Sequence, residues 1–385
     1  MRFPEFSGEW KKSSIREQFE LYSGNTPSRM NKNQFDGSIN WITSGELKEH
    51  YISDTKEKIS EEAAKNNSLK LLPVGTFVIA IYGLEANGVR GTCSITTRES
   101  TISQACMAFT SKMDIQNEFL YSWYKKHGNI IGIKYAQGTK QQNLSYDIIE
   151  RFNISYPCME EQKKLIRFIS LIDQRIATQN KIIEDLKKLK SAIIEIEYSP
   201  KDSYHSHIGG AIVQISKRNK DNHLCNVLSV SNRQGFIKQS EQFEDRNVAS
   251  DDTSNYKIVE KNDFAYNPAR INVGSIARLT KFETGIVSPM YICFRTKDCL
   301  LPEYLELFFE SRNFFYHIQK RLEGSVRLCL SYEELCNIPI VIPSIEKQKQ
   351  VDLHLSKLAQ KIDLEMKILQ FVQQQKTYLL HQMFI

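Results

Sequence analysis

A short segment, Phe264–Arg270, contains residue types that handle an amine in other proteins. Amino-methyltransferases hold the target amine with an Asn-Pro-Pro-aromatic loop, but here Tyr266 precedes Asn267-Pro268 and Arg270 follows it. The sequence also has no Gly-rich strand-turn-helix segment of the type that binds a methyl donor. We therefore interpret Asn267-Pro268 as a turn at the end of a strand. This interpretation leaves Arg270 and Arg278 to project toward a polyanion.

A second segment, Gly83–Gly91, is rich in glycine and lies between two predicted strands. It lacks the Gly-Lys-Ser/Thr ending of a phosphate-binding loop, and no helix follows to contribute its N-terminus. Nucleotide binding is therefore not expected. Two interpretations stay open: a plain hairpin, or a flexible loop that offers Arg90 and backbone amides to DNA phosphates.

The nearest approach to a metal site is the set His205, His207 and Cys225. Three donors without ordered spacing are weak support for a metal, and we interpret them as linker residues. No Asp/Glu cluster has nuclease spacing, and no Ser/His/Asp order is present. We expect no catalytic residue, no metal and no cofactor in this chain.

Basic, amide and aromatic residues alternate in six further segments. Arg, Asn and Gln side chains can read base edges, while Lys, Ser and Thr contact the nucleic-acid backbone. Each segment alone is more typical of a solvated loop, but six of them on two related domains favour DNA as a partner. The candidate DNA-contacting residues are Arg29, Trp41, Thr43, Ser44, Tyr82, Arg90, Gln104, Lys140, Arg218, Arg233, Tyr266, Asn267, Arg270, Arg278 and Arg327.

The composition sets the broad class. The 385 residues include 51 basic and 45 acidic side chains, a formal charge of +6, which permits nucleic acid as a partner without requiring it. The length favours two or three domains, and 41% hydrophobic residues are typical of a globular chain. The eight cysteines form no C-x-x-C pair, so we expect reduced thiols. With no long apolar run and no leader pattern, we expect a soluble, cytoplasmic protein with no membrane partner.

The second half of the sequence repeats the first at a spacing of 186 residues. Leu144–Tyr146 matches Leu330–Tyr332, and Pro157–Lys163 matches Pro343–Lys349. The similarity weakens toward the start of each half. A repeat of this length predicts two copies of one structural unit, related by a pseudo-twofold.

Each half ends in a heptad pattern, at 157–198 and 343–385. Apolar residues alternate at spacings of four and three without Gly or Pro, which predicts two long helices, each roughly 60 Å, that pair as a coiled coil. Polar residues interrupt both patterns at matched places, Gln179 with Glu365 and Lys190 with Lys376, and we interpret them as fixing register. The alternative is two ordinary amphipathic helices packed on their own domains. The predicted seam is Leu165, Ile169, Ile172, Ile176, Ile183, Leu186, Val351, Leu355, Leu358, Ile362, Leu369 and Val372.

The two fronts, 1–156 and 199–342, are predicted to be mixed α+β domains, because short apolar runs alternate with turn signals. Helices are expected at 13–21, 54–66, 116–127 and 302–322. The expected strands are 39–43, 77–82, 92–97, 106–109, 211–215, 227–231, 263–266, 275–279 and 291–294.

Several short strings occur in a specific order: Phe6–Trp10, Gly24–Arg29, Trp41–Leu47 and Ser103–Cys106, then Gly274–Ala277 in the second half. With the paired helix starts, they make the chain resemble the specificity (S) subunit of type I restriction–modification systems over essentially its whole length. The resemblance implies two target-recognition domains that each read one half of a bipartite double-stranded DNA site.

The same resemblance implies that the long helices pair antiparallel as a spacer and dock two modification (methyltransferase) subunits. Restriction/translocase subunits would join that core. Adenine methylation and ATP-dependent cleavage would belong to these partners, so the chain would be a non-catalytic subunit of a host-defence system. The alternative from another class is a coiled-coil scaffold whose globular ends bind other proteins.

Overall fold

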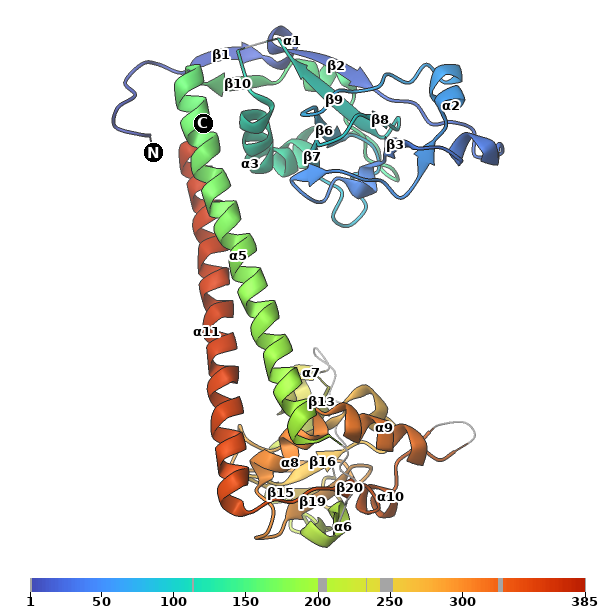
Figure 1. Ribbon diagram of the computed structural model, residues 1–385, viewed down its shortest axis with the longest axis vertical. Helices are drawn as coiled ribbons and strands as arrows, with labels where there is room; N and C mark the ends of the chain where they lie inside the picture. Colours follow the sequence, from blue (N-terminus) through green and yellow to red (C-terminus); the bar gives the residue numbers. More distant parts are fainter. Residues whose placement is uncertain are drawn as a thin grey trace. The chain divides into compact units, whose positions relative to one another are not determined.

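The computed structural model describes residues 2–112, 114–199, 206–232, 234–242, 252–324 and 328–384. The chain divides into two units, Met1–Gln179 with Ile368–Ile385 (unit 1), and Asn180–Lys367 (unit 2). Each unit consists of a mixed α/β domain and a part of each of two long helices, α5 (Met159–Glu197) and α11 (Ile345–Met383) (Figure 1). His205, Arg233 and Arg327 lie outside the described residues.

The domain of unit 1 contains a five-stranded sheet in the order β2-β9-β6-β7-β4 and a three-stranded sheet in the order β5-β3-β8. Strands β3 and β8 are parallel, and a separate antiparallel pair, β1 with β10, closes the domain. The bounds are β1 Lys11–Ser14, β2 Phe19–Ser23, β3 Ile39–Ile42, β4 Tyr51–Ile52, β5 Lys58–Ile59, β6 Phe77–Ala80, β7 Cys93–Thr96, β8 Ser100–Ile102, β9 Cys106–Ser111 and β10 Asn153–Tyr156.

The core of unit 1 forms where one helix covers the larger sheet. Every residue of β6 is buried, as expected for a continuous apolar run in a central strand. Helix α3 (Asn117–Tyr135) packs Phe119, Leu120 and Tyr124 into the same core. The shorter helices are α1 Ile15–Gln18, α2 Glu61–Asn66 and α4 Tyr146–Glu150, with 3-10 turns η1 Lys32–Phe35 and η2 Ser44–Glu46.

The domain of unit 2 repeats this topology. Its sheets have the orders β12-β19-β16-β17 and β14-β13-β18-β15, and β11 pairs with β20. The bounds are β11 Ser206–His207, β12 Ile212–Ile215, β13 Val227–Ser231, β14 Gly235–Lys238, β15 Lys257–Glu260, β16 Phe264–Tyr266, β17 Ile276–Arg278, β18 Thr284–Val287, β19 Ile292–Thr296 and β20 Pro339–Ile340, with helices α6 Ile208–Ala211, α7 Gln239–Gln242, η3 Ile271–Val273, α8 Pro302–Phe309, α9 Arg312–Arg321 and α10 Tyr332–Cys336.

The structural repeat extends into the divergent fronts. Strands β2, β9, β6 and β7 correspond in order and direction to β12, β19, β16 and β17. The parallel pair β3 and β8 corresponds to β13 and β18. The internal repeat predicted from the sequence is therefore confirmed for the fold, including regions in which the two sequences have little in common.

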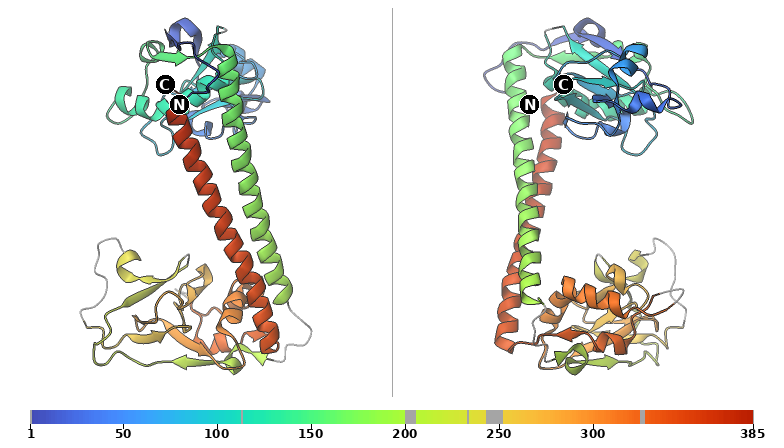
Figure 2. Two further views of the ribbon diagram at one scale, coloured as in Figure 1. Left: turned by 90° about the vertical axis from the view of Figure 1, so that its left-hand side faces the viewer. Right: turned by 45° about the vertical axis from the view of Figure 1, so that its right-hand side comes forward.

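The two long helices run antiparallel within each unit (Figures 1 and 2). In unit 1, Leu165 and Ile169 near the start of α5 share a core with Met383 and Phe384 at the end of α11. In unit 2, Ile194 near the end of α5 shares a core with Val351 and Leu355 near the start of α11. The predicted seam residues are buried or half-buried: Leu165, Ile169, Ile183, Val351, Leu355, Ile362 and Val372 are buried, while Ile172, Ile176, Leu186, Leu358 and Leu369 are half-buried.

Three predicted helices were partly wrong. Within residues 13–21 only the short helix α1 forms, and a Ser14–Glu17 capping box caps its N-terminus. The chain then continues as strand β2, because Phe19 and Leu21 alternate along it and point into the core. Residues 54–66 contain β5 before α2 begins at its N-cap Ser60. Residues 302–322 break into α8 and α9 at Ser311, whose hydroxyl accepts from Phe314 N–H and so starts a new helix.

Candidate nucleic-acid interface

Three loops of unit 1 meet where β3, β6 and β8 end. The Ser103 N–H donates to the Ile42 carbonyl, and the amides of Ile81 and Tyr82 both point to the Ala105 carbonyl. This arrangement gathers four predicted DNA-contacting residues at one edge of the domain. They are Thr43 and Ser44 after β3, Tyr82 after β6 and Gln104 after β8, of which Tyr82 and Gln104 are exposed.

A fourth loop, 137–143, joins the same edge. An isolated β-bridge between Gln137 and Asn143 closes it, and Gly138 supplies a φ of +109° that other residues rarely adopt. Leu144 N–H donates to the Ile81 carbonyl, which docks the loop on the end of β6. The predicted contact Lys140 lies exposed within this loop. The edge therefore carries a cation beside polar and aromatic side chains.

The Arg90 side chain is half-buried and packs inside this edge, so its guanidinium does not project into solvent. Its guanidinium Nη2 donates to the Gln142 side-chain oxygen at 2.5 Å. Its aliphatic stem lies against Gly132 of α3, where an added Cβ would come within 2.6 Å of the Arg90 Cγ. We therefore correct the predicted phosphate contact: Arg90 holds loop 137–143 in place through its hydrogen bond to Gln142. Gln142, which the sequence did not single out, is the partner.

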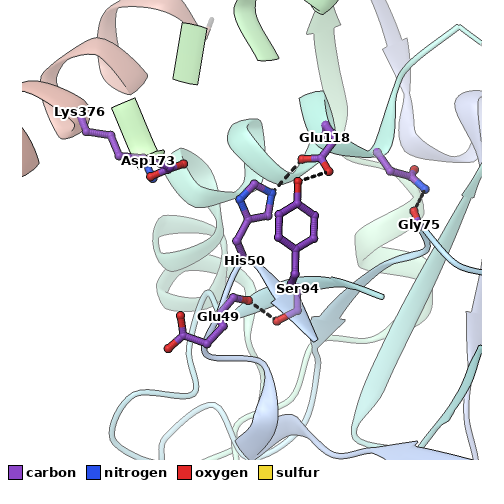
Figure 3. A network of polar contacts seen from close by, with 9 residues as sticks. Glu49, His50, Gly75, Ser94, Glu118, Asp173 and Lys376 are labelled. Atoms are coloured by element: carbon purple, nitrogen blue, oxygen red, sulfur yellow. Dashed lines mark hydrogen bonds and ion pairs between the residues drawn. The ribbon is translucent and has the colours of Figure 1, made fainter. Parts of the chain in front are cut away.

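The loop after β3 is held rigidly at both ends. Thr43 and Glu46 form a capping box around η2, and the Ser94 hydroxyl donates to the Glu49 carbonyl. His50 Nε2 lies 2.8 Å from the Glu118 carboxylate of α3 (Figure 3). The His50 ring also stacks on Tyr51. The Tyr51 hydroxyl donates to the same carboxylate, and burial followed by this bond raises the pKa of Tyr51 to about 12. Thr43 and Ser44 are thus presented from a fixed loop.

Arg29 is exposed but already paired. Two nitrogens of its guanidinium donate to the two oxygens of Glu57 at 2.8 and 2.9 Å. The group also lies 5.4 Å from the Phe35 ring centroid and 5.9 Å from that of Trp41. The hydrogen bond from Arg29 lowers the pKa of Glu57. Arg29 can reach a phosphate only in competition with this carboxylate.

Three predicted contacts are buried, so we correct them. Trp41 is 2% exposed and its indole N–H donates to the Asn25 carbonyl. Tyr266 is fully buried, with its hydroxyl donating to Leu330 O. Asn267 is buried and its side-chain oxygen accepts from Ala269 N–H, which agrees with a turn. Side chains enclosed in this way stabilise the domain and do not offer their polar atoms to a base edge.

Two of these backbone connections recur at the corresponding edge of unit 2. Leu330 N–H donates to the Pro268 carbonyl after β16, and Glu323 and Cys329 form the bridge that matches the Gln137–Asn143 bridge. Arg270 lies exposed just beyond Pro268, and no described residue forms an ion pair with it. Arg270 is therefore, like Lys140, a predicted contact whose charged group is exposed.

Arg278 and Arg218 lie in other surroundings. The Arg278 side chain is 12% exposed and forms ion pairs with Glu303 and Glu306 of α8. We therefore correct its predicted role: it ties α8 to β17. Arg218 is exposed and donates to the Asn255 side-chain oxygen at 2.8 Å. Its outer position is compatible with a contact to a nucleic acid.

The described residues contain no group of three metal-ligating side chains. Burial raises the pKa of Cys93, Cys106 and Cys293 to about 12, so these thiols stay protonated near neutral pH. No helix in the described part of the chain has the length and apolar character that a membrane span requires. What the two edges offer is a set of hydrogen-bonding groups and cations in fixed loops.

The sequence comparisons all find similarity to specificity subunits of type I restriction systems. Residues 7–188 match the family described as the type I restriction modification DNA specificity domain. Among curated proteins, the type I restriction enzyme MjaIX specificity subunit of Methanocaldococcus jannaschii is 28% identical over 199 residues, and the EcoR124I/EcoR124II specificity subunit of Escherichia coli is 27% identical over 192. These alignments cover 50% and 49% of this chain. They span 45% and 46% of the two relatives, about half of their length.

Solved structures share the fold along the whole chain. The S subunit of a type I restriction-modification system from M. genitalium covers 100% of this chain and 99% of its own, with a TM-score of 0.57 at 14% identity. A structure from work on assembly and conformational transition of the type I R-M system gives a TM-score of 0.62 at 12% identity over 98% of both chains. The HsdS subunit of Thermoanaerobacter tengcongensis gives 0.51 at 12% identity, covering 99% and 97%.

The fold is that of two α/β domains of one topology, each packed with parts of two long helices that run antiparallel within the unit. In sequence, residues 7–188 are similar to the type I restriction modification DNA specificity domain, and about half of the chain is similar to type I restriction enzyme specificity subunits.

Proposed function

We propose that the protein is the sequence-recognition subunit of a type I restriction–modification complex and binds a bipartite DNA site. The observation that supports this most directly is the repeated edge. Leu144 docks on Ile81 in unit 1, and Leu330 docks on Pro268 in unit 2, by the same backbone bond. Two domains with the same frame and different loop residues are suited to reading two unlike half-sites.

The contact set that we propose comes from the exposed or half-exposed side chains of the loops. Lys and Arg supply phosphate neutralisation, and hydroxyl and amide groups supply base-edge hydrogen bonds. Arg233 and Arg327 remain predictions from the sequence. The set within the described residues is Arg29, Thr43, Ser44, Tyr82, Gln104, Lys140, Arg218 and Arg270.

We further propose the division of labour along the chain. Residues 1–156 and 199–342 recognise DNA, while 157–198 and 343–385 act as the spacer and dock two modification subunits. Large apolar side chains on the outer faces of both helices support docking, because exposed apolar groups favour partner binding when they cluster. These are Leu171, Leu189, Ile196, Leu353, Leu364, Phe371 and Tyr378, each at least half exposed.

Methyl transfer and ATP-dependent cleavage would then reside on the modification and restriction/translocase subunits. The assembly would act in the cytoplasm, where the DNA is. This chain would supply recognition and alignment, without a catalytic group or a cofactor of its own.

The decisive experiment is a methylome from cells that express the chain with its cognate modification subunit. We expect one bipartite motif with two different halves and a fixed spacer. Replacing residues 1–156 by the front of another family member should change one half of the motif and leave the other intact. A motif in which both halves change together, or no motif at all, would contradict the proposal.

A gel-shift of the same complex across salt concentrations provides an independent measurement. Counterion release predicts that DNA affinity falls steeply as salt rises. Binding that does not respond to salt would favour the alternative class, a scaffold whose globular ends bind proteins.

A further inference from the structure

Gln162, in the first turn of α5, has a side-chain amide whose hydrogen bonds are all made inside unit 1. Its oxygen accepts from the Gln116 N–H at 3.0 Å. Its nitrogen donates to the carbonyls of Asp114 and Pro157, at 2.8 and 3.1 Å. The residue is completely buried. The amide thus uses both of its N–H donors and its oxygen, in three of the four hydrogen bonds that it can make.

Gln348, in the first turn of α11, repeats these bonds in unit 2. Its oxygen accepts from the Leu301 N–H at 2.8 Å. Its nitrogen donates to the carbonyls of Cys299 and Pro343, at 3.0 and 2.9 Å. It is also completely buried. The partners occupy corresponding positions in the two halves.

In each unit the amide connects the first turn of the long helix to two other segments. One accepting carbonyl, of Pro157 or Pro343, lies just before the long helix. The other carbonyl and the donating N–H lie in the loop before α3 or α8. Gln116 and Leu301 are the N-cap residues of those helices, and neither has a side-chain cap of its own. Each glutamine therefore joins the start of a long helix to the start of the helix that covers the recognition sheet.

The ion pairs at the two helix starts differ. Glu161 forms a bidentate ion pair with Arg2 in unit 1, whereas its counterpart Lys347 lies 3.7 Å from Glu197 in unit 2. The glutamine clamp, by contrast, is a polar connection that both units share. Only a side chain with an acceptor and two donors on one rigid plane can make it.

We propose that Gln162 and Gln348 are positioning residues that fix the angle at which each recognition domain leaves its spacer helix, and thereby restrict the spacer length of the DNA site. This inference rests on the proposed function. A domain that can tilt at this junction would accept half-sites that are one base pair too near or too far. A domain held by three hydrogen bonds would reject them.

The test uses the complex with its modification subunits and the motif found in the methylome. Methylation rates are measured on duplexes with the native spacer and with one base pair added or removed. We expect the Q162M/Q348M variant to raise the ratio of altered-spacer to native-spacer methylation about tenfold, which corresponds to about 1.4 kcal/mol. Each single variant should give an intermediate ratio, and the half-site sequences should stay the same.

The matched control removes buried hydrogen bonds away from the long helices. Thr76 donates to the Pro73 carbonyl, and Ser275 donates to the Val230 carbonyl, so T76V/S275A should lower the melting temperature without changing the spacer ratio. If the double clamp variant cannot be purified, Q162E and Q348E keep the acceptor oxygen and lose both donors, and each should raise the ratio. A ratio that stays at the wild-type value in stable clamp variants would overturn the inference. Absence of methylation by the wild-type complex would instead overturn the proposed function.

Discussion

The ammonium of Lys376 in α11 lies 2.5 Å from an Asp173 oxygen of α5, and this ion pair joins the two long helices within unit 1. Both side chains are only 20–30% exposed, at 22% and 29%. Lys376 stands where the sequence has a polar interruption in the heptad pattern. The interruption is thus a connection between helices, although half-buried ion pairs add little net stability.

A double-mutant cycle on this pair should separate pairing from burial. Replacing Lys376 by Met leaves Asp173 half-buried without its partner, so we expect a loss of about 1–3 kcal/mol in the free energy of unfolding. The double variant D173L/K376M should recover most of that loss, because no charge is left unpaired. Denaturant unfolding of the wild type, D173L, K376M and the double variant measures the coupling. Equal losses in K376M and in the double variant would show that the pair has no such role.

Phe384 connects the end of α11 to the core of unit 1. It is fully buried and its ring centroid lies 5.2 Å from that of Phe119 in α3. The Phe384→Ala variant should lose about 3–5 kcal/mol, the usual cost of removing a buried phenylalanine ring. The matched control is Phe371→Ala on the same helix, which is 59% exposed and should change stability by less than about 0.5 kcal/mol. Thermal unfolding of both variants tests the difference.

The repeat shows what the sequence could and could not predict. The clamp motif was visible in both halves, because Gln162 and Gln348 must each supply one acceptor and two donors. The fronts looked unrelated, yet β3 and β13 occupy the same place in their sheets. A strand position requires only an apolar side chain of suitable size, so the topology can persist after the sequence similarity is lost.

The candidate site was predicted less well than the fold, because the burial of a side chain depends on contacts with residues that are distant in the sequence. Trp41 and Arg90 stand in polar, glycine-rich segments that are typical of exposed loops, and no local pattern of residues indicates that their side chains are buried. Trp41 packs with Ile59 and Ala63, and Arg90 lies on Gly132, partners that are distant along the chain. Burial by such long-range contacts cannot be inferred from local residue types.

Arg278 and Arg270 should respond oppositely to substitution. Arg278→Met removes the partner of Glu303 and Glu306, and we expect a loss of about 1–3 kcal/mol in stability with unchanged DNA affinity of the folded complex. Arg270→Ala should leave the melting temperature unchanged and weaken DNA binding, lowering the salt slope by about one. Unfolding curves and salt-dependent gel-shifts of the two variants check this. Loss of DNA affinity in R278M with wild-type stability would contradict the assignment.

The Arg29–Glu57 pair should depend on pH. The hydrogen bond from Arg29 lowers the pKa of Glu57 below its ordinary value of 4.5, so the pair is complete above that value and is lost as the pH falls through the lowered pKa. Because the Arg29 guanidinium lies 5.9 Å from the Trp41 ring, Trp41 fluorescence in a W10F/W123F background should change on acidification below pH 4.5. E57Q should abolish the change. An identical titration in E57Q would mean that another group is responsible.

The spacer hypothesis predicts a change in the DNA site when the long helices are shortened. Seven residues removed from the middle of both α5 and α11 preserve the heptad pattern and shorten each helix by about 10 Å. At about 3.4 Å per base pair, the methylated motif should keep both halves and have a spacer shorter by about three base pairs. Shortening only one helix breaks the pairing of the seam and should abolish methylation, which serves as the control. A methylome with an unchanged spacer in the doubly shortened protein would show that these helices do not set the distance between the half-sites.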